Sequence, residues 1–124
     1  MLYAFSLKKT LKERIKLITQ TIQDMFDDIP SSCYYWANIV EMQREGYNVN
    51  KYILVDTESG SGDEYTITKQ QFVDAYNKLH NFALAEDINA WQKRIIRDTV
   101  SENYDAETID MLLQYTLFND LIYG

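Results

Sequence analysis

The chain has 124 residues, of which 46% are hydrophobic and 25% charged, with one cysteine and a net charge of −7 at neutral pH. This length and composition predict a single folded domain over residues 1–124 and exclude a disordered chain. No apolar run is long enough to span a bilayer, and the lone Cys33 excludes a disulfide framework, so we expect a cytoplasmic protein without membrane association.

Charge is distributed unevenly along the chain. Residues 1–20 carry five basic side chains and one acidic side chain, whereas the other 104 residues carry seven basic and 18 acidic ones, a net charge of −11. Ten of the 17 aromatic residues are tyrosines, which are favoured at protein interfaces but also line half-buried strands. This composition indicates a protein that meets another macromolecule through a charged face.

The first predicted element is an amphipathic helix over about residues 8–27. Its apolar side chains recur every three or four residues, at Leu7, Leu11, Ile15, Ile18, Ile22, Met25, Phe26 and Ile29. Pro30 ends the helix, because its ring and its missing N–H do not fit a helix interior. A basic stripe of Lys8, Lys12 and Lys16 accompanies the apolar face. The stripe is either a solvated face or a site for phosphates or acidic residues.

Asp24, Asp27 and Asp28 lie at the end of this helix, where the helix dipole disfavours negative charge. Each such charge costs a few tenths of a kcal/mol at an exposed site. We therefore expect these carboxylates to contact another element or to serve some other purpose.

Three strands are predicted after the helix. The segment 34–42 is rich in aromatic and β-branched residues, and a turn follows it at Gly46. Residues 52–56 and 65–68 have the same strand composition and flank a Ser-Gly loop at residues 59–63. An antiparallel meander is the simplest arrangement of these strands.

The remainder of the chain is predicted to be helical. Thr68 and Gln71 match a capping box that opens one helix, a second helix covers about residues 86–99, and a third begins at Asp105. The apolar segment 121–123 is expected to dock on the core. The predicted fold class is therefore α+β, with an N-terminal helix, a three-stranded antiparallel meander and three C-terminal helices packed on the sheet.

Catalytic signatures are absent from the sequence, including those of zinc proteases, redox proteins, serine hydrolases and nucleotide-binding loops. The segment 56–67 begins like a calcium-binding loop, but Ser61 and Ile67 stand where glycine and glutamate are needed. His80 and Cys33 are expected to be structural, because the sequence provides no matching trio of nucleophile, base and orienting group. We expect neither an enzyme nor a metal or cofactor site.

Two acidic sets are candidates for binding a partner. The hairpin set comprises Asp56, Glu58, Asp63 and Glu64, with Tyr65 beside them. The helical set comprises Glu86, Asp87, Asp98, Glu102, Asp105, Glu107 and Asp110. If the sets converge on one face, they would present a negative field of the kind that nucleic-acid-binding proteins engage, and otherwise they are solubilising charge. The residues selected as partner-binding are Asp56, Glu58, Asp63, Glu64, Tyr65, Glu102, Asp105, Glu107 and Asp110.

Two stretches of the chain resemble a family from mobile genetic elements. They are Tyr34-Tyr35-Trp36-Ala37 and the terminal pattern Asp105…Asp110…Gln114…Leu117-Phe118…Tyr123-Gly124. In these motifs and in its order of elements, the chain resembles a loose family of small, acidic, uncharacterised proteins encoded by bacteriophages and prophages. It departs from the family at Asn119, where glycine commonly follows the Leu-Phe pair. The resemblance implies a protein of the bacterial cytoplasm and carries over no activity or functional residue.

Three functions follow as hypotheses. The first is a non-enzymatic binding protein that inhibits a host protein, such as a nucleic-acid-handling or defence enzyme, by occupying its basic surface with an acidic, tyrosine-bearing face. The second is a structural or regulatory homo-oligomer whose basic first helix docks on the acidic body of a neighbour. The third is a nucleic-acid accessory protein using Lys8, Lys12 and Lys16. We do not expect direct nucleic-acid binding, because the negative charge of residues 21–124 repels phosphates.

Overall fold

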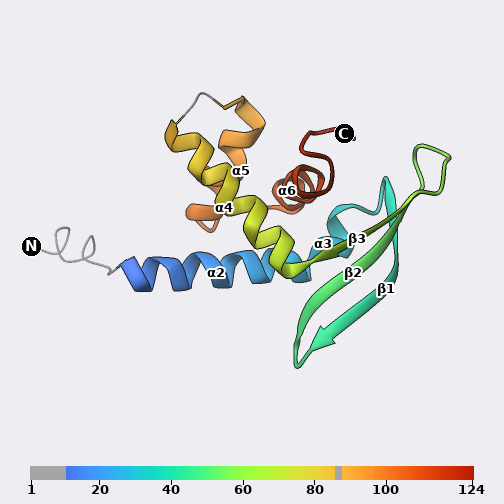
Figure 1. Ribbon diagram of the computed structural model, residues 1–124, viewed down its shortest axis with the longest axis horizontal. Coiled ribbons are helices and arrows are strands. Elements are labelled where there is room, and N and C mark those ends of the chain that lie inside the picture. Colours follow the sequence, from blue (N-terminus) through green and yellow to red (C-terminus); the bar gives the residue numbers. More distant parts are fainter. Residues whose placement is uncertain (1–10, 86–87) are drawn as a thin grey trace, which may run out of the picture.

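The structure is a computed structural model that describes residues 11–85 and 88–124. Labelled as in Figure 1, its elements are α2 (Leu11–Asp27), α3 (Ile29–Ser32), β1 (Ala37–Glu45), β2 (Asn48–Asp56), β3 (Glu64–Thr68), α4 (Lys69–Ala85), α5 (Ala90–Val100) and α6 (Ala106–Phe118). This order confirms the predicted α+β class, with a helix, then three strands, then three helices. Within these described ranges, no helix is long and apolar enough to cross a membrane.

The first helix buries the face that its apolar spacing predicts. Ile22, Met25 and Phe26 are buried, and α2 ends at Asp27. Pro30 lies in the first turn of α3, where a helix leaves its N–H groups without an internal partner in any case. The predicted helix end before Pro30 is confirmed, and the proline begins a new short helix.

The three strands form an antiparallel sheet in the order β1-β2-β3, which confirms the predicted meander. Strand β1 begins later than predicted, at Ala37, because residues 34–36 form a turn after α3. Hydrogen bonds from the N–H groups of Trp36 and Ala37 to the carbonyl oxygen of Cys33 close this turn, at 3.0 and 2.9 Å. A bulge at Val40 interrupts the pairing of β1 with β2.

One core joins the helices to the inner face of the sheet. The ring of Phe26 in α2 lies 5.0 Å from that of Tyr52 in β2 and 5.5 Å from that of Phe72 in α4. Helix α6 is buried from Thr108 to Tyr115 and is seen end-on near the centre of Figure 1. Helix α4 packs on β2 and β3, whereas α5 and α6 pack mainly on other helices.

Local hydrogen bonds start each of the last three helices. The capping box of Thr68 and Gln71 is confirmed, with reciprocal bonds of 2.9 and 3.1 Å. Asn89 caps α5, so this helix begins at Ala90 and not near residue 86, and residues 86–87 lie outside the described part of the chain. Asp105 caps α6, as predicted.

The C-terminal segment is docked on the core, as predicted. The buried Gln114 side chain accepts hydrogen bonds from the N–H groups of Ile122 and Tyr123, both at 2.8 Å. The Tyr123 ring stacks on Trp36, with ring centroids 5.0 Å apart. The chain turns into this segment at Asn119, whose φ of 56° is left-handed. Asparagine tolerates this conformation better than most residues, so the turn forms here without a glycine.

Candidate functional site

Asp56 is not part of an exposed acidic face, contrary to the sequence prediction. Its side chain is buried and accepts hydrogen bonds from the N–H groups of Glu58 and Ser59, at 2.9 and 3.0 Å, and from the Tyr123 hydroxyl. Burial acts to raise the pKa of Asp56, but these hydrogen bonds outweigh it and hold the pKa below its ordinary value. The carboxylate closes the β2–β3 loop and anchors the C-terminal segment.

Asp110 is also buried, which corrects a second prediction. It accepts hydrogen bonds from the Trp36 indole N–H at 2.8 Å, from the Gln114 amide at 3.0 Å and from the Tyr35 hydroxyl. Burial raises the pKa of this carboxyl, although the three hydrogen bonds act to lower it. Asp110 joins α6 to the turn before β1 and is out of reach of a partner.

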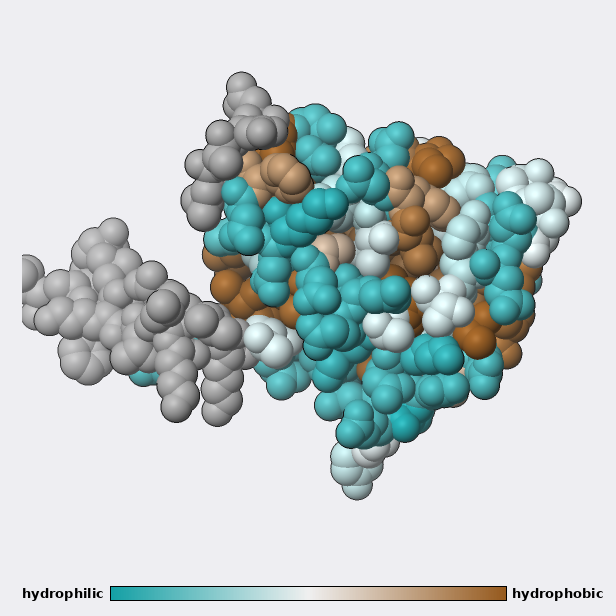
Figure 2. Space-filling view, in the orientation of Figure 1, coloured by the Kyte–Doolittle hydropathy of each residue, from teal (hydrophilic) through white to brown (hydrophobic). Residues whose placement is uncertain are grey.

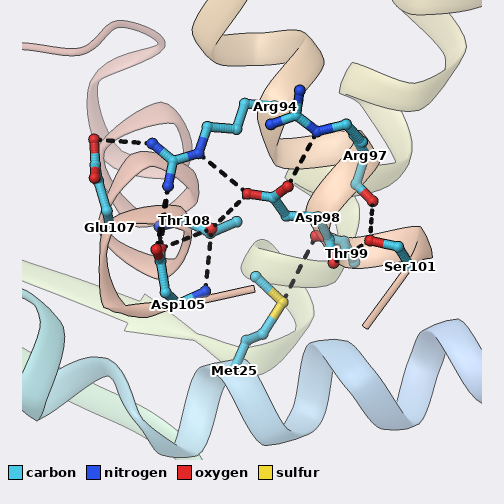
Figure 3. Close-up of polar contacts among 9 residues, drawn as sticks. All are labelled: Met25, Arg94, Arg97, Asp98, Thr99, Ser101, Asp105, Glu107 and Thr108. Carbon is cyan, nitrogen blue, oxygen red and sulfur yellow. Dashed lines mark hydrogen bonds and ion pairs between the residues drawn. The ribbon is translucent and has the colours of Figure 1, made fainter. Parts of the chain in front are cut away.

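Asp105 and Glu107 are exposed but engaged by a cation. Figure 3 shows the Arg94 guanidinium between these two carboxylates and Asp98, at 3.2, 3.0 and 3.1 Å respectively. Asp105 additionally accepts the Thr108 N–H at the start of α6. These contacts fasten α5 to α6, and the single positive charge of Arg94 offsets only part of the negative charge of the three carboxylates.

We predict that Asp98→Asn destabilises the protein in a pH-dependent way. The buried Asp98 carboxylate accepts bonds from Arg94, Arg97 and Thr108, at 3.1, 3.2 and 3.0 Å (Figure 3). Burial acts to raise its pKa, but these bonds hold the pKa below its ordinary value. The variant should lose about 1–3 kcal/mol of unfolding free energy at neutral pH, measured in urea.

The deficit of Asp98→Asn should shrink in acid. A carboxyl whose folded pKa is depressed stabilises the fold above its unfolded pKa of about 3.9, and this contribution is lost as pH falls through the folded pKa. An equal deficit at neutral pH and at about pH 3 would show that the ionised form of Asp98 is not what stabilises the wild type.

The rest of the hairpin set lies apart from the helical set. Glu58, Asp63 and Glu64 are exposed at and beside the β2–β3 loop, which lies at the opposite end of the molecule from α5 in Figure 1. Tyr65 faces inward and packs its ring edge-on against Phe118, with ring centroids 5.2 Å apart. The two predicted sets therefore do not converge, and Tyr65 belongs to the core edge.

A different set of carboxylates converges on Tyr104. The pKa of this half-buried tyrosine is raised first by burial and then by the nearby charges of Asp24, Asp28 and Glu102. Glu102 follows α5, and its carboxylate accepts a hydrogen bond from Thr21 of α2 at 3.4 Å. We call Asp24, Asp28, Glu102 and Tyr104 the Tyr104 surface.

Of the residues in the Tyr104 surface, only Glu102 was predicted to bind a partner. Asp24, Asp28 and Tyr104 were not. The signal for Asp24 and Asp28 was visible in the sequence, because both stand where the dipole of α2 disfavours them. Their neighbour Asp27 instead accepts the Val49 N–H of β2 at 3.0 Å. No sequence signal connects α2 to Glu102, since packing of α5 on α2 brings them together.

The basic stripe falls largely outside the described part of the chain. Lys8 lies in residues 1–10, which the structure does not describe. Lys12 and Lys16 belong to α2, but their side chains are likewise outside the described part. The role predicted for the stripe remains a prediction.

Cys33 and His80 are both packed against the protein interior. Cys33 is buried, and burial together with the charge of Asp110 raises the pKa of its thiol to about 12. The half-buried His80 stacks on Tyr76, with ring centroids 6.1 Å apart. Over residues 11–85 and 88–124, no three histidine, cysteine or acidic side chains are grouped to hold a metal ion.

Comparisons of the chain with family models, with curated proteins and with solved structures find no match.

Proposed function

We propose that this protein is a non-enzymatic binding protein that occupies a basic surface on another protein through the Tyr104 surface. The observation that carries the proposal is the 3.4 Å hydrogen bond from Thr21 of α2 to Glu102, which brings this carboxylate to the helix that carries Asp24. The charges of Asp24, Asp28 and Glu102 all act on the half-buried Tyr104. The C-terminal end of α2 adds its partial negative charge to that of Asp24 and Asp28. Such a surface attracts a basic partner at long range, and the tyrosine supplies contact area with few rotors.

The biological setting is part of the same proposal. The resemblance to phage and prophage proteins supports a role in the bacterial cytoplasm, where the protein would bind and inhibit a host factor that itself engages nucleic acid. Such host factors carry basic surfaces that complement clustered carboxylates. The net charge of −11 over residues 21–124 argues against direct binding to nucleic acid.

The test compares two variants with equal net charge. Asp24→Asn, Asp28→Asn and Glu102→Gln together neutralise the Tyr104 surface, and the control combines Glu58→Gln, Asp63→Asn and Glu64→Gln. Proteins captured from a bacterial lysate would be identified by mass spectrometry, and the affinity of a purified partner measured. We expect the first variant to bind about tenfold more weakly, and the control to bind like the wild type.

Salt and oligomeric state complete this test. Binding through the Tyr104 surface should weaken at high salt, because exposed charges are screened. Partners that bind both variants equally well at low salt, or that bind the wild type unchanged at high salt, would overturn the proposal, as would the absence of any partner. Light scattering that shows a salt-sensitive homo-oligomer, with no other partner captured, would favour the oligomer hypothesis instead.

A further inference from the structure

A groove runs along α4 between the edge of β3 and the C-terminal end of α6. Its two parts between these helices have volumes of about 480 and 240 Å³ and share Lys78, Tyr115 and Asn119. A shallower hollow continues along α4 over Lys78 and Phe82. Figure 2 looks onto this region, where apolar side chains show between the polar surface of α4 and the C-terminal segment. We call this feature the α4–α6 groove.

The floor of the groove presents a polar group without a partner. Tyr115 is only 6% exposed and lines both deeper parts, while its ring packs edge-on against Trp91. Among the described residues its hydroxyl has no hydrogen-bond partner, and burial alone raises the pKa of this group. The oxygen is not among the buried side-chain atoms that lack a partner, so it is open to water and can bind a ligand.

Lys78 is the one cationic residue among the described residues that line the groove. It lines all three hollows, and no described carboxylate forms an ion pair with it. Its ammonium group lies 5.8 Å from the centroid of the Phe82 ring. Asp74, one turn earlier on α4, lines two of the three hollows and accepts a hydrogen bond from Gln70 at 2.8 Å. An acidic group on a ligand would complement Lys78 in the part of the groove that Asp74 does not line. The apolar surface in that part is provided by Leu79, Phe82 and Ile88.

The edge of β3 supplies backbone groups next to the groove. The Thr68 N–H donates to the Gln71 side chain at 2.9 Å and so points away from β2. Alternate residues of a strand point their backbone groups to opposite edges, so those of Thr66 also face the free edge. Thr66 lines the groove and lies on the strand that ends the sheet. An extended chain can pair with such an edge.

We propose that the α4–α6 groove binds an extended peptide of another protein, which pairs with the edge of β3 at Thr66 and places an acidic side chain against Lys78 and an apolar side chain beside Phe82. Along α4, Gln71 and Phe82 are about 16 Å apart, the length of about five extended residues. Lys78 and Phe82 are one helical turn apart, which matches side chains two residues apart on an extended peptide. The inference does not rest on the Tyr104 surface.

The experiment is a selection from a displayed library of random peptides of about seven residues, which is slightly longer than the groove's span of about five. Wild-type protein should enrich peptides with an acidic residue two positions from an apolar one. Lys78→Glu should exchange this acidic preference for a basic one. The matched control Lys93→Glu changes the charge equally at an exposed α5 residue outside the groove and should select the wild-type sequences. The proposal would be overturned if the wild type enriched no sequence, or if Lys78→Glu selected the same peptides as the wild type.

A second variant tests the floor of the groove. Tyr115→Phe removes a hydroxyl with no described partner, so thermal unfolding should be unchanged, while affinity for a selected peptide should fall about three- to tenfold. Unchanged affinity would remove Tyr115 from the site and contradict the geometry proposed. Light scattering gives the remaining check, because a dimer that Lys78→Glu dissociates would show that a second copy of the chain occupies the groove, and would overturn the proposal.

Discussion

Replacement of Asp110 by alanine is expected to lower the free energy of unfolding by about 3–5 kcal/mol, measured by urea denaturation. The carboxylate is the shared acceptor of the Trp36 indole, the Tyr35 hydroxyl and the Gln114 amide. Trp36 and Gln114 are fully buried, so their donors would lose a charged acceptor with little access to water. Hydrogen bonds to charged groups are about twice as strong as neutral ones, and leaving a buried donor unpaired adds its desolvation cost.

Two further variants calibrate this result. Asp110→Asn keeps the shape and one acceptor oxygen, so it should cost less than alanine. Asp63→Ala removes an exposed carboxylate of the β2–β3 loop and should change stability by no more than about 0.5 kcal/mol. If Asp110→Ala is as mild as Asp63→Ala, the carboxylate does not hold the turn before β1 against α6.

Replacement of Gln114 by leucine is expected to release the C-terminal segment and to cost about 2–4 kcal/mol. The Gln114 amide accepts the N–H groups of Ile122 and Tyr123 and donates to the Tyr123 carbonyl oxygen at 3.1 Å. Leucine fills a similar volume but replaces none of these bonds. The stack of Tyr123 on Trp36 should then open. Carboxypeptidase digestion and a red shift of tryptophan fluorescence would measure the release.

Tyr123→Phe is the matched control for the release. It removes the bond from the hydroxyl to Asp56 but leaves the ring stack and the Gln114 bonds in place. Residues 119–124 should therefore stay protected from digestion in this variant. If Gln114→Leu leaves the segment as resistant as Tyr123→Phe does, the Gln114 side chain is not what docks it.

Most of the fold could be predicted because its signals are local. The Thr68–Gln71 box, the Asp105 cap and the break before Pro30 each depend on residues within one turn, and all three are confirmed. The start of β1 was predicted three residues early, since Tyr34 and Tyr35 have strand composition but lie in the turn closed on Cys33. Tertiary packing of α3 against α6 overrides that local preference.

The candidate site was predicted less well, because the role of a carboxylate depends on distant partners. Asp56 and Asp110 have the composition of surface acids, yet they are buried by Tyr123, Trp36 and Tyr35 from other parts of the chain. A buried charge persists only where hydrogen bonds satisfy it, and no local pattern reports such partners.

The sequence by itself determined the order of the elements, their approximate limits and the excess of negative charge after residue 20, since these follow from composition, periodicity and neighbouring residues. The tertiary structure alone decided which carboxylates are internal and which converge. It buried Asp110, engaged Asp105 with Arg94, and brought Glu102 to Asp24 and Asp28 through the packing of α5 on α2. The physical reason is that electrostatic fields and desolvation depend on distance in space, and folding makes that distance independent of separation along the chain.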